Sequence, residues 1–239
     1  MEHCELTFHN PALDLACDEV LLDVCEAGRA GSLLRLWEPA RHFVVVGYGN
    51  AVASEVNIEF CRRHSIPILR RCSGGGTVLQ GPGCLNYALL LQVEDHPALQ
   101  GIGGTNEFVL QRHREALAAL LKTPVEKKGH TDLAIGGLKF SGNAQRRRKR
   151  FLLFHGCFLL NLDIDLLQQV LPLPSRQPDY RSNRSHADFL LNLKVPAQML
   201  KAALLKAWEA TEPLARAPVE QITALAREKY ARDEWNWKF

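Results

Sequence analysis

The sequence predicts one mixed α/β (α+β) domain built on a largely antiparallel sheet with flanking helices. Three observations lead to this fold class. Helical and strand-like segments alternate irregularly along the 239 residues, and the strand-like segments are short and often adjacent, as in hairpins. The strand–helix alternation also breaks after Leu121, which disfavours a regular doubly wound parallel sheet.

Helices are predicted from apolar spacing and from the residues that cap helix ends. Asn10 and Pro11 open the first helix, and Thr105 is placed to cap a later one. Pro218 stands at the expected start of the last helix. In chain order, helices are expected near residues 10–27, 56–64, 105–121, 196–211 and 219–231.

Strands are predicted where apolar and β-branched residues run between turn residues. They are expected near residues 33–37, 43–46, 85–92, 132–135, 138–141 and 151–160, and the apolar run 66–69 leads into a glycine-rich block. The segment from Leu171 to Ala187, rich in Pro, Arg and Ser, is expected to be loop.

Composition excludes several classes of function. The net charge of +3 is too small to indicate nucleic-acid binding, and no apolar run approaches the ~20 residues that span a bilayer. The N-terminus lacks the basic and apolar regions of a secretory signal. The 7 cysteines include no C-x-x-C pair and no zinc-finger spacing, which is typical of a reducing compartment. We therefore expect a cytoplasmic protein that binds neither membrane nor nucleic acid.

The most specific segment is RRCSGGGTVLQGPGCLNY, residues 70–87. Three consecutive glycines weaken a strand, so they are expected where a ligand approaches bare backbone. Arg71 beside that loop suits a phosphate or carboxylate, because a guanidinium donates two parallel hydrogen bonds. A loose glycine turn is the plain alternative for the glycines alone.

A second block, GHTDLAIGGLKFSGNAQ at residues 129–145, precedes FLLFHGCFLL at residues 151–160. Together with the glycine block, these segments resemble the lipoate–protein ligase and octanoyltransferase family, which is related to the biotin ligases. The resemblance covers roughly residues 10–193. Matching positions in the second block and the strand after it are Asp132, Leu133, Lys139, Ser141, Gly142, Ala144, Gln145, His155 and Gly156. Upstream, Gly47, Asn50, Glu55 and Asn57 match as well.

The resemblance implies a biotin/lipoate ligase-like catalytic domain at residues 1–195, with residues 196–239 as its helical extension and no separate accessory domain. It also implies an acyl-adenylate made from lipoate and ATP with Mg, and transfer to a lysine of a lipoyl-domain protein. Lys139 is the candidate catalytic residue, and Asp132 could hold Mg. The substrate and adenylate would be bound by Arg71, Ser73, Gly74, Gly75, Gly76, Asn86, Asp132, Ser141, Gly142 and His155. Val44 to Val46 and Leu69 could line an acyl tunnel.

Each candidate also has a structural explanation. Lys139 could be an edge-strand lysine that discourages aggregation, and Asp132 could be the acid of a turn. His155 could be structural, and Cys72 and Cys84 could be packing residues. Arg184 and His186 reach the site only if the resemblance holds.

The family's ATP-independent transferases carry the acyl group on a cysteine. One branch has that cysteine just before the lysine strand, and the other has it after the His-Gly strand. Here residues 122–138 and 171–177 contain no cysteine, which favours the ligase. A thioester transferase, a catalytic subunit that needs a separate accessory chain, and a non-catalytic acyl-carrier binder remain open. Gln80 and the Tyr48-Gly49 pair depart from the family pattern.

The basic run RRRKR, comprising Arg146, Arg147, Arg148, Lys149 and Arg150, follows the lysine motif directly. Such runs are commonly solvated hairpin tips. Lipoyl domains are generally acidic, as the resemblance implies, so the alternative is that this run docks the acceptor protein.

Overall fold

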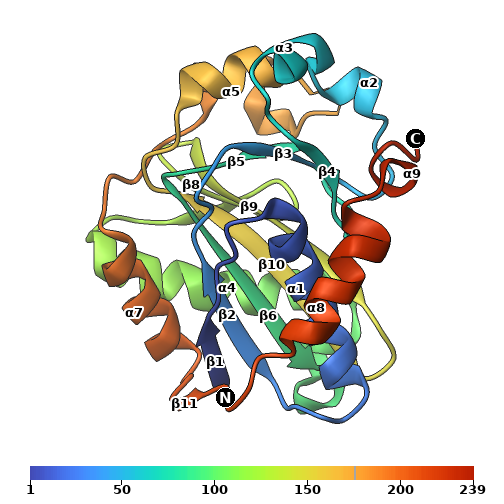
Figure 1. Cartoon of the computed structure of the whole chain (residues 1–239). Coiled ribbons are helices and arrows are strands. Elements are labelled where there is room, and N and C mark those ends of the chain that lie inside the picture. Colours follow the sequence, from blue (N-terminus) through green and yellow to red (C-terminus); the bar gives the residue numbers. More distant parts are fainter. Residues whose placement is uncertain (175) are drawn as a thin grey trace.

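The computed structural model describes residues 1–174 and 176–239 (Figure 1). The strands are β1 Glu2–Glu5, β2 Leu33–Trp37, β3 Phe43–Val46, β4 Ile68–Arg70, β5 Val78–Gln80, β6 Cys84–Gln92, β7 Glu126–Lys128, β8 Asp132–Ile135, β9 Leu138–Arg147, β10 Phe151–Leu159 and β11 Glu212–Pro213. Within the described residues they form an 8-stranded sheet, ordered β11-β1-β2-β6-β10-β9-β8-β7, and a 3-stranded sheet, ordered β4-β3-β5.

The helices are α1 Pro11–Glu26, α2 Val52–Glu55, α3 Ile58–Arg63, α4 Ile102–Leu121, α5 Ile164–Val170, α6 His186–Phe189, α7 Ala197–Ala207, α8 Val219–Leu225 and α9 Asp233–Asn236. Short 3₁₀ turns occupy Val93–Asp95, Pro97–Gln100 and Asp179–Arg181, and a π-helical turn at Ala226–Tyr230 follows α8. Nowhere in the described residues does a helix combine the length and apolarity needed to cross a bilayer.

The predicted fold class is confirmed. From β2 through β6, β10, β9 and β8 to β7, every neighbouring pair is antiparallel, whereas β1 runs parallel to both β2 and β11. The small sheet is mixed too, because β3 is parallel to β4 and antiparallel to β5.

Helices cover both faces of the large sheet, because alternate strand residues point to opposite sides. Ala88 and Leu90 of β6 pack in the apolar cluster that contains α1 and residues after α8. Leu89 and Leu91 pack on the other side, in the cluster of α4 and α7. In Figure 1, α1 and α8 lie in front of the sheet and α4 lies behind it.

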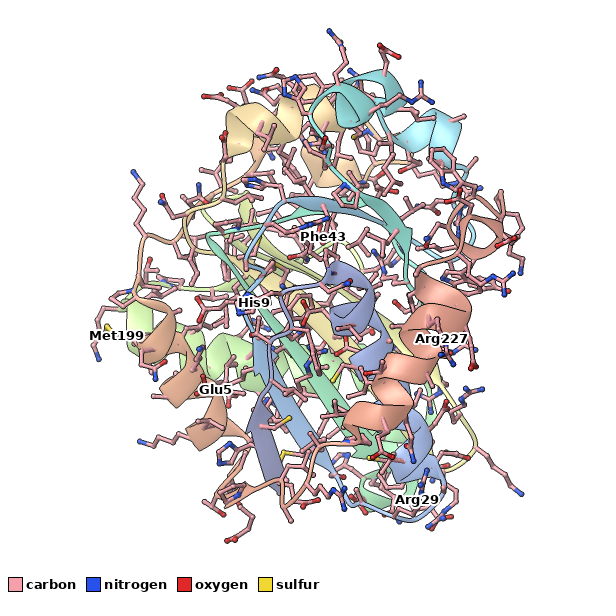
Figure 2. All side chains as sticks on the ribbon, viewed as in Figure 1. Glu5, His9, Arg29, Phe43, Met199 and Arg227 are labelled. Atoms are coloured by element: carbon pink, nitrogen blue, oxygen red, sulfur yellow. The ribbon has the colours of Figure 1, made fainter. Side chains whose placement is uncertain are left out.

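The small sheet lies across one end of the large sheet, with α2, α3 and α5 above it (Figure 1). A third apolar cluster joins β3, α3 and α5. Figure 2 places Phe43, the first residue of β3, in the middle of the molecule, with Met199 and Arg227 on opposite sides. The loop between β4 and β5 of the small sheet meets strands β9 and β10 of the large sheet, and the candidate site lies there.

Several predicted boundaries were wrong for identifiable reasons. The helix expected at 56–64 is α3, which begins at Ile58 because Val56 is extended and the Asn57 side chain caps it, and the separate short helix α2 precedes it. Helix α4 begins at Ile102, and Thr105 bonds back to the Gly101 carbonyl instead of capping. The lysine strand, expected to end at Ser141, runs to Arg147 because β10 pairs with it from Ser141 to Arg147.

The predicted loop at 171–187 contains a 3₁₀ turn and the start of α6, and its Ser175 lies outside the described residues.

Candidate functional site

The glycine loop, residues 73–76, is held in its conformation by hydrogen bonds from the buried side chain of Arg71. The Arg71 guanidinium is buried and donates from Nη2 to the Gly74 carbonyl at 2.6 Å and the Gly76 carbonyl at 2.7 Å. Its Nε donates to Ser73 Oγ at 3.1 Å. Burial lowers the pKa of Arg71 to about 10, so it remains cationic at neutral pH. Arg71 thus directs its donors at the loop itself and places a buried positive charge beneath it.

Gly47 and Asn50, which precede α2, both contact the Gly75 carbonyl of the loop. Gly75 has φ +86°, a conformation that favours glycine, and its carbonyl accepts from Asn50 Nδ2 at 3.2 Å. A Cβ added at Gly47 would lie 2.1 Å from that same carbonyl oxygen. Gly47 is therefore required by the close approach of the loop backbone, and Gly74 to Gly76 remain exposed above it.

A row of paired residues crosses four strands beneath the loop. Strand register aligns Arg35 with Ala88, Ala88 with His155, and His155 with Ala144. These side chains share one face of the sheet. The methyl-sized Ala88 leaves room above it for Asp18 of α1, which contacts both Arg35 and His155.

A continuous chain of polar contacts results. Arg35 Nη1 donates to Asp18 Oδ1 at 2.6 Å, and the other carboxylate oxygen of Asp18 lies 2.9 Å from His155 Nδ1. His155 Nε2 lies 2.6 Å from Ser73 Oγ. A second acid, Asp14, contacts Arg35 Nη2 at 2.9 Å. We call Asp14, Arg35, Asp18, His155 and Ser73 the buried polar chain.

Hydrogen-bond donors and acceptors define the proton positions along it. Although burial raises the pKa of Asp18, the Arg35 charge and His155 more than offset that effect and lower it overall. An ionised carboxylate can accept but not donate, so His155 Nδ1 carries the proton. In the neutral ring Nε2 is then the acceptor, and the Ser73 hydroxyl donates to it.

Lys139 lies on the same sheet face as His155. Its Nζ contacts Asp132 Oδ1 at 2.7 Å, and a Cβ added at Gly142 would lie 2.9 Å from that ammonium. Asp132 Oδ2 accepts from Tyr180 at 2.8 Å. The Lys139 side chain is 26% exposed and the Asp132 side chain 11%. The lysine is therefore held by a carboxylate yet open to a ligand.

Register brings the lysine and the histidine close together. Gly142, beneath Lys139, pairs with Cys157, and the next row on this face pairs Ala144 with His155. Two residues along a strand span about 6–7 Å. The glycine loop covers this place too, because a Cβ on Gly75 would lie 3.4 Å from Ala144 Cβ. Lys139, Gly142, His155, Ser73 and the glycines therefore form one site.

Two other predicted residues take different positions. Asn86 pairs with Cys157 on this face but donates to Gln80 Oε1 at 2.9 Å and is buried. Ser141 pairs with Phe158, whose side chain packs in the cluster on the far face of the sheet. The structure thus places Asn86 at the floor of the site and separates Ser141 from it.

The cysteines are all free thiols in the described part of the chain. Cys157 lies on the site face, but a hydrogen bond to Cys84 and burial raise its pKa well above the ordinary value. Burial likewise raises the pKa of Cys72 to about 12. Neither thiol is in the electropositive, exposed setting that activates a nucleophile.

The basic run divides between the two sides of the hairpin end. Arg146 Nη1 donates to the Cys72 carbonyl at 2.8 Å, whereas Arg147 Nη1 donates to Thr105 Oγ1 of α4 at 3.1 Å. Arg148 pairs with Asp23 at 2.8 Å, and the Arg150 amide donates to Glu26. Arg148, Lys149 and Arg150 are exposed, next to the last turn of α1.

Sequence reasoning missed Asp18, Arg35 and Tyr180. A signal existed for the first two: Asp14 and Asp18 are acids four residues apart on a helix, and Arg35 interrupts the apolar strand LLRLW. Tyr180 came from a segment expected to be loop. In that segment Arg184 donates to the Gly137 carbonyl and joins the loop to the lysine hairpin, whereas His186 donates to the Pro172 carbonyl within the loop.

Two hollows elsewhere on the surface do not coincide with this chemistry. One, of about 400 Å³, lies between the start of α1, β4 and α9, and another of about 750 Å³ lies beside the end of α1. Neither is lined by Lys139, His155 or the glycine loop. No group of three or more His, Cys, Asp or Glu within residues 1–174 and 176–239 is placed to hold a metal ion.

The chain is similar to known proteins in both sequence and fold. The chain is 29% identical to octanoyltransferase LipM of Geobacillus kaustophilus, over 95% of this chain and 94% of the relative. It is 28% identical to lipoate–protein ligase A subunit 1 of Thermoplasma acidophilum, over 95% and 92%. A crystal structure of lipoate–protein ligase A bound with ATP superposes with a TM-score of 0.85 at 22% identity, covering 99% of this chain and 98% of that one, which establishes the fold.

The family model described as the lipoyl protein ligase A/B catalytic domain matches residues 10–226. That range takes in the glycine loop, the lysine hairpin and the His-Gly strand. Similar curated proteins include both ligases and octanoyltransferases, which are enzymes. The chain therefore belongs to the lipoyl protein ligase A/B catalytic-domain family and is a lipoate–protein ligase or a related transferase.

Proposed function

We propose that the protein is an ATP-dependent lipoate–protein ligase that forms lipoyl-adenylate and transfers the lipoyl group to a lysine of a lipoyl-domain protein. The observation that carries this proposal is the placement of Lys139, which lies against Gly142, one row of paired residues from His155, on the face that the glycine loop covers. Both places where family transferases have their cysteine lack one here.

The parts suit acyl activation and transfer. The Lys139 ammonium would stabilise negative charge on the acyl carbonyl and phosphate oxygens as it develops. The carbonyls of Gly74, Gly75 and Gly76 are held by Arg71 and Asn50, which leaves the loop amides to face an anionic adenylate. Arg71 contributes from below as a buried positive charge.

ATP and Mg are the implied cofactors, with lipoate as the substrate. Mg²⁺ is usually bound by one or two carboxylates together with substrate phosphates. Asp132 fits the first requirement, although both of its oxygens are engaged by Lys139 and Tyr180 in the free protein. Metal binding would therefore accompany release of Lys139 toward the nucleotide.

A transferase that carries the octanoyl or lipoyl group as a thioester is the second candidate, because LipM octanoyltransferases are among the similar proteins. Cys157 is a thiol on the site face. We expect single substitutions of Cys72, Cys84 and Cys157 by serine or alanine to leave acyl transfer within about twofold, because Cys72 and Cys84 are buried and the pKa values of the Cys72 and Cys157 thiols are raised. Loss of transfer in one folded variant would favour the thioester route.

Assembly with other chains is part of the proposal. The Thermoplasma relative is called a subunit, and a related structure describes a bi-partite ligase, so a separate accessory chain could complete adenylation here. We propose that residues 196–239 belong to the catalytic domain, since Leu200, Leu204 and Tyr230 enter its apolar clusters. The free thiols favour a cytoplasmic location.

One experiment tests the ligase directly. Purified protein is incubated with lipoate, ATP and Mg, and mass spectrometry monitors lipoyl-adenylate in solution and acyl groups on the protein. The ligase predicts adenylate that depends on ATP and no thioester on the enzyme. Transfer to a lipoyl domain from an octanoyl thioester without ATP would overturn it.

A further inference from the structure

The buried polar chain is costly to keep inside the protein. Arg35 and Asp18 are almost fully buried, with side-chain exposures of 0% and 4%, and each buried ion costs several kcal/mol before pairing. Apolar residues of similar volume often stabilise a core as well as a buried ion pair does. The chain therefore suggests a task other than stability, and its one partly exposed side chain, His155 at 12%, is where that task would be performed.

The location of His155 indicates what the task is. Lys139, the group that would polarise the acyl carbonyl, lies against Gly142. The row of paired residues that contains Gly142 is about 6–7 Å along the strands from the row that pairs Ala144 with His155. That spacing between the rows leaves room for a carbonyl carbon and an attacking amine. Nδ1 of His155 is committed to Asp18, so Nε2 is the atom that can take a proton.

We propose that His155 is the proton acceptor when the lysine amine of the acceptor protein attacks the activated acyl group, and that Asp18 is the residue that positions it. This inference rests on the proposed function, because it requires an activated acyl donor. It assigns to His155 a proton transfer in addition to contact with the adenylate.

The step balances as follows. The amine nitrogen forms a bond to the acyl carbon, and the bond from that carbon to the phosphate oxygen breaks, with its electron pair leaving on AMP. The amine proton passes to Ser73 Oγ while the Ser73 hydroxyl proton, hydrogen-bonded to His155 Nε2, moves onto that nitrogen. The new Nε2–H then donates to Ser73 Oγ. The resulting imidazolium is stabilised by the ionised Asp18, whose second oxygen stays paired with Arg35.

The test separates the two half-reactions. Wild-type protein and the variants Asp18→Asn and His155→Gln are given ATP and lipoate for adenylate formation, and synthetic lipoyl-adenylate with a lipoyl domain for transfer. Positioned general bases contribute about 100- to 10,000-fold. We expect both variants to slow transfer about 100-fold or more while adenylate formation stays within about threefold. Glu19→Gln, the neighbouring buried acid that contacts Tyr230 instead, is the matched control and should transfer normally.

Hydroxylamine distinguishes a base from a structural role. It is uncharged near neutral pH and needs little help to lose a proton, so both variants should still be acylated onto hydroxylamine at near the wild-type rate. A parallel fall in hydroxylamine and lysine transfer, or unchanged lysine transfer, would overturn the proposal. Because His155→Gln leaves the Arg35–Asp18 pair intact, it remains informative if Asp18→Asn does not fold.

Nitrogen-15 NMR of the histidine ring provides an independent readout. The wild-type ring should show a protonated Nδ1 and an unprotonated Nε2, and the signal is assigned by its loss in His155→Gln. Asp18→Asn should shift the ring toward the other tautomer, and an unchanged tautomer would remove Asp18 from the role. If wild-type protein makes no adenylate but transfers from synthetic adenylate, the ligase proposal fails while the His155 comparison still stands.

Discussion

The two charged clusters of the site differ in how tightly they are held. In the buried polar chain, Asp18 binds Arg35 with one oxygen and His155 with the other, and Arg35 also holds Asp14. In the lysine corner, formed by Lys139, Asp132 and Tyr180, the cation is 26% exposed and its carboxylate has a second donor. The first arrangement fixes a ring in one orientation, and the second lets a cation leave its partner for a ligand at low cost.

Removing the ammonium group of Lys139 should have the largest effect. Lys139→Ala is expected to lower turnover about 100- to 1,000-fold, the range for one donor aimed at developing charge. Because the side chain is partly exposed, the melting temperature should change little. Steady-state kinetics and a thermal melt check this. A variant that keeps more than about a tenth of the rate would make Lys139 a surface residue.

Altering the backbone beneath the loop should come next. Gly47→Ala introduces a methyl group 2.1 Å from the Gly75 carbonyl, so the loop must move, and we expect a loss of about 1–3 kcal/mol in the free energy of unfolding together with weaker ATP binding. Gly49→Ala is the matched control, since its added Cβ meets nothing within 4 Å. Equal behaviour of the two variants in denaturant titrations would contradict this account of the loop.

The buried polar chain should make the free energy of unfolding depend on pH. Burial, only partly countered by an arginine shared with Asp18, raises the pKa of Asp14 to about 7 from its ordinary 3.8. The folded state therefore keeps a proton on Asp14 that the unfolded state has released, so the contribution of Asp14 to the free energy of unfolding falls as pH rises from about 4 to 7.

Asp14→Asn should flatten that fall by about 2–4 kcal/mol, measured by urea titration at several pH values. Asp165→Asn, an exposed acid at the start of α5, should leave the pH profile unchanged. A wild-type profile that rises between pH 4 and 7, with no change in Asp14→Asn, would show that Asp14 is ionised like an ordinary surface acid.

The same contrast explains which residues of the site could be predicted from the sequence. Local patterns and family-like motifs identified the glycine loop, Lys139, Asp132 and His155, because those residues lie in short contiguous segments. Asp18 and Arg35 could not be joined to them, since that contact depends on strand register across β2, β6 and β10 and on where α1 crosses them. Tyr180 was missed for a similar reason: it reaches Asp132 from 48 residues away in a segment without periodicity.

The smallest expected effect concerns the basic run, which lies outside both clusters. Arg146 and Arg147 bind carbonyl and hydroxyl groups of the protein itself, so Arg148 and Lys149 are the members best placed to meet a partner. Replacing both with serine should reduce kcat/KM for an acidic lipoyl domain by a few-fold while adenylate formation stays unchanged, because clustered charge mainly raises encounter rates. Raising the salt concentration should erase the difference, since the Debye length is about 10 Å at 0.1 M and about 3 Å at 1 M.

Arg62→Ser with Arg63→Ser removes the same charge from the exposed face of α3 and controls for net charge. If both double variants lose the same amount, overall charge and not this hairpin end attracts the acceptor; if neither loses any, the run is a solvated turn.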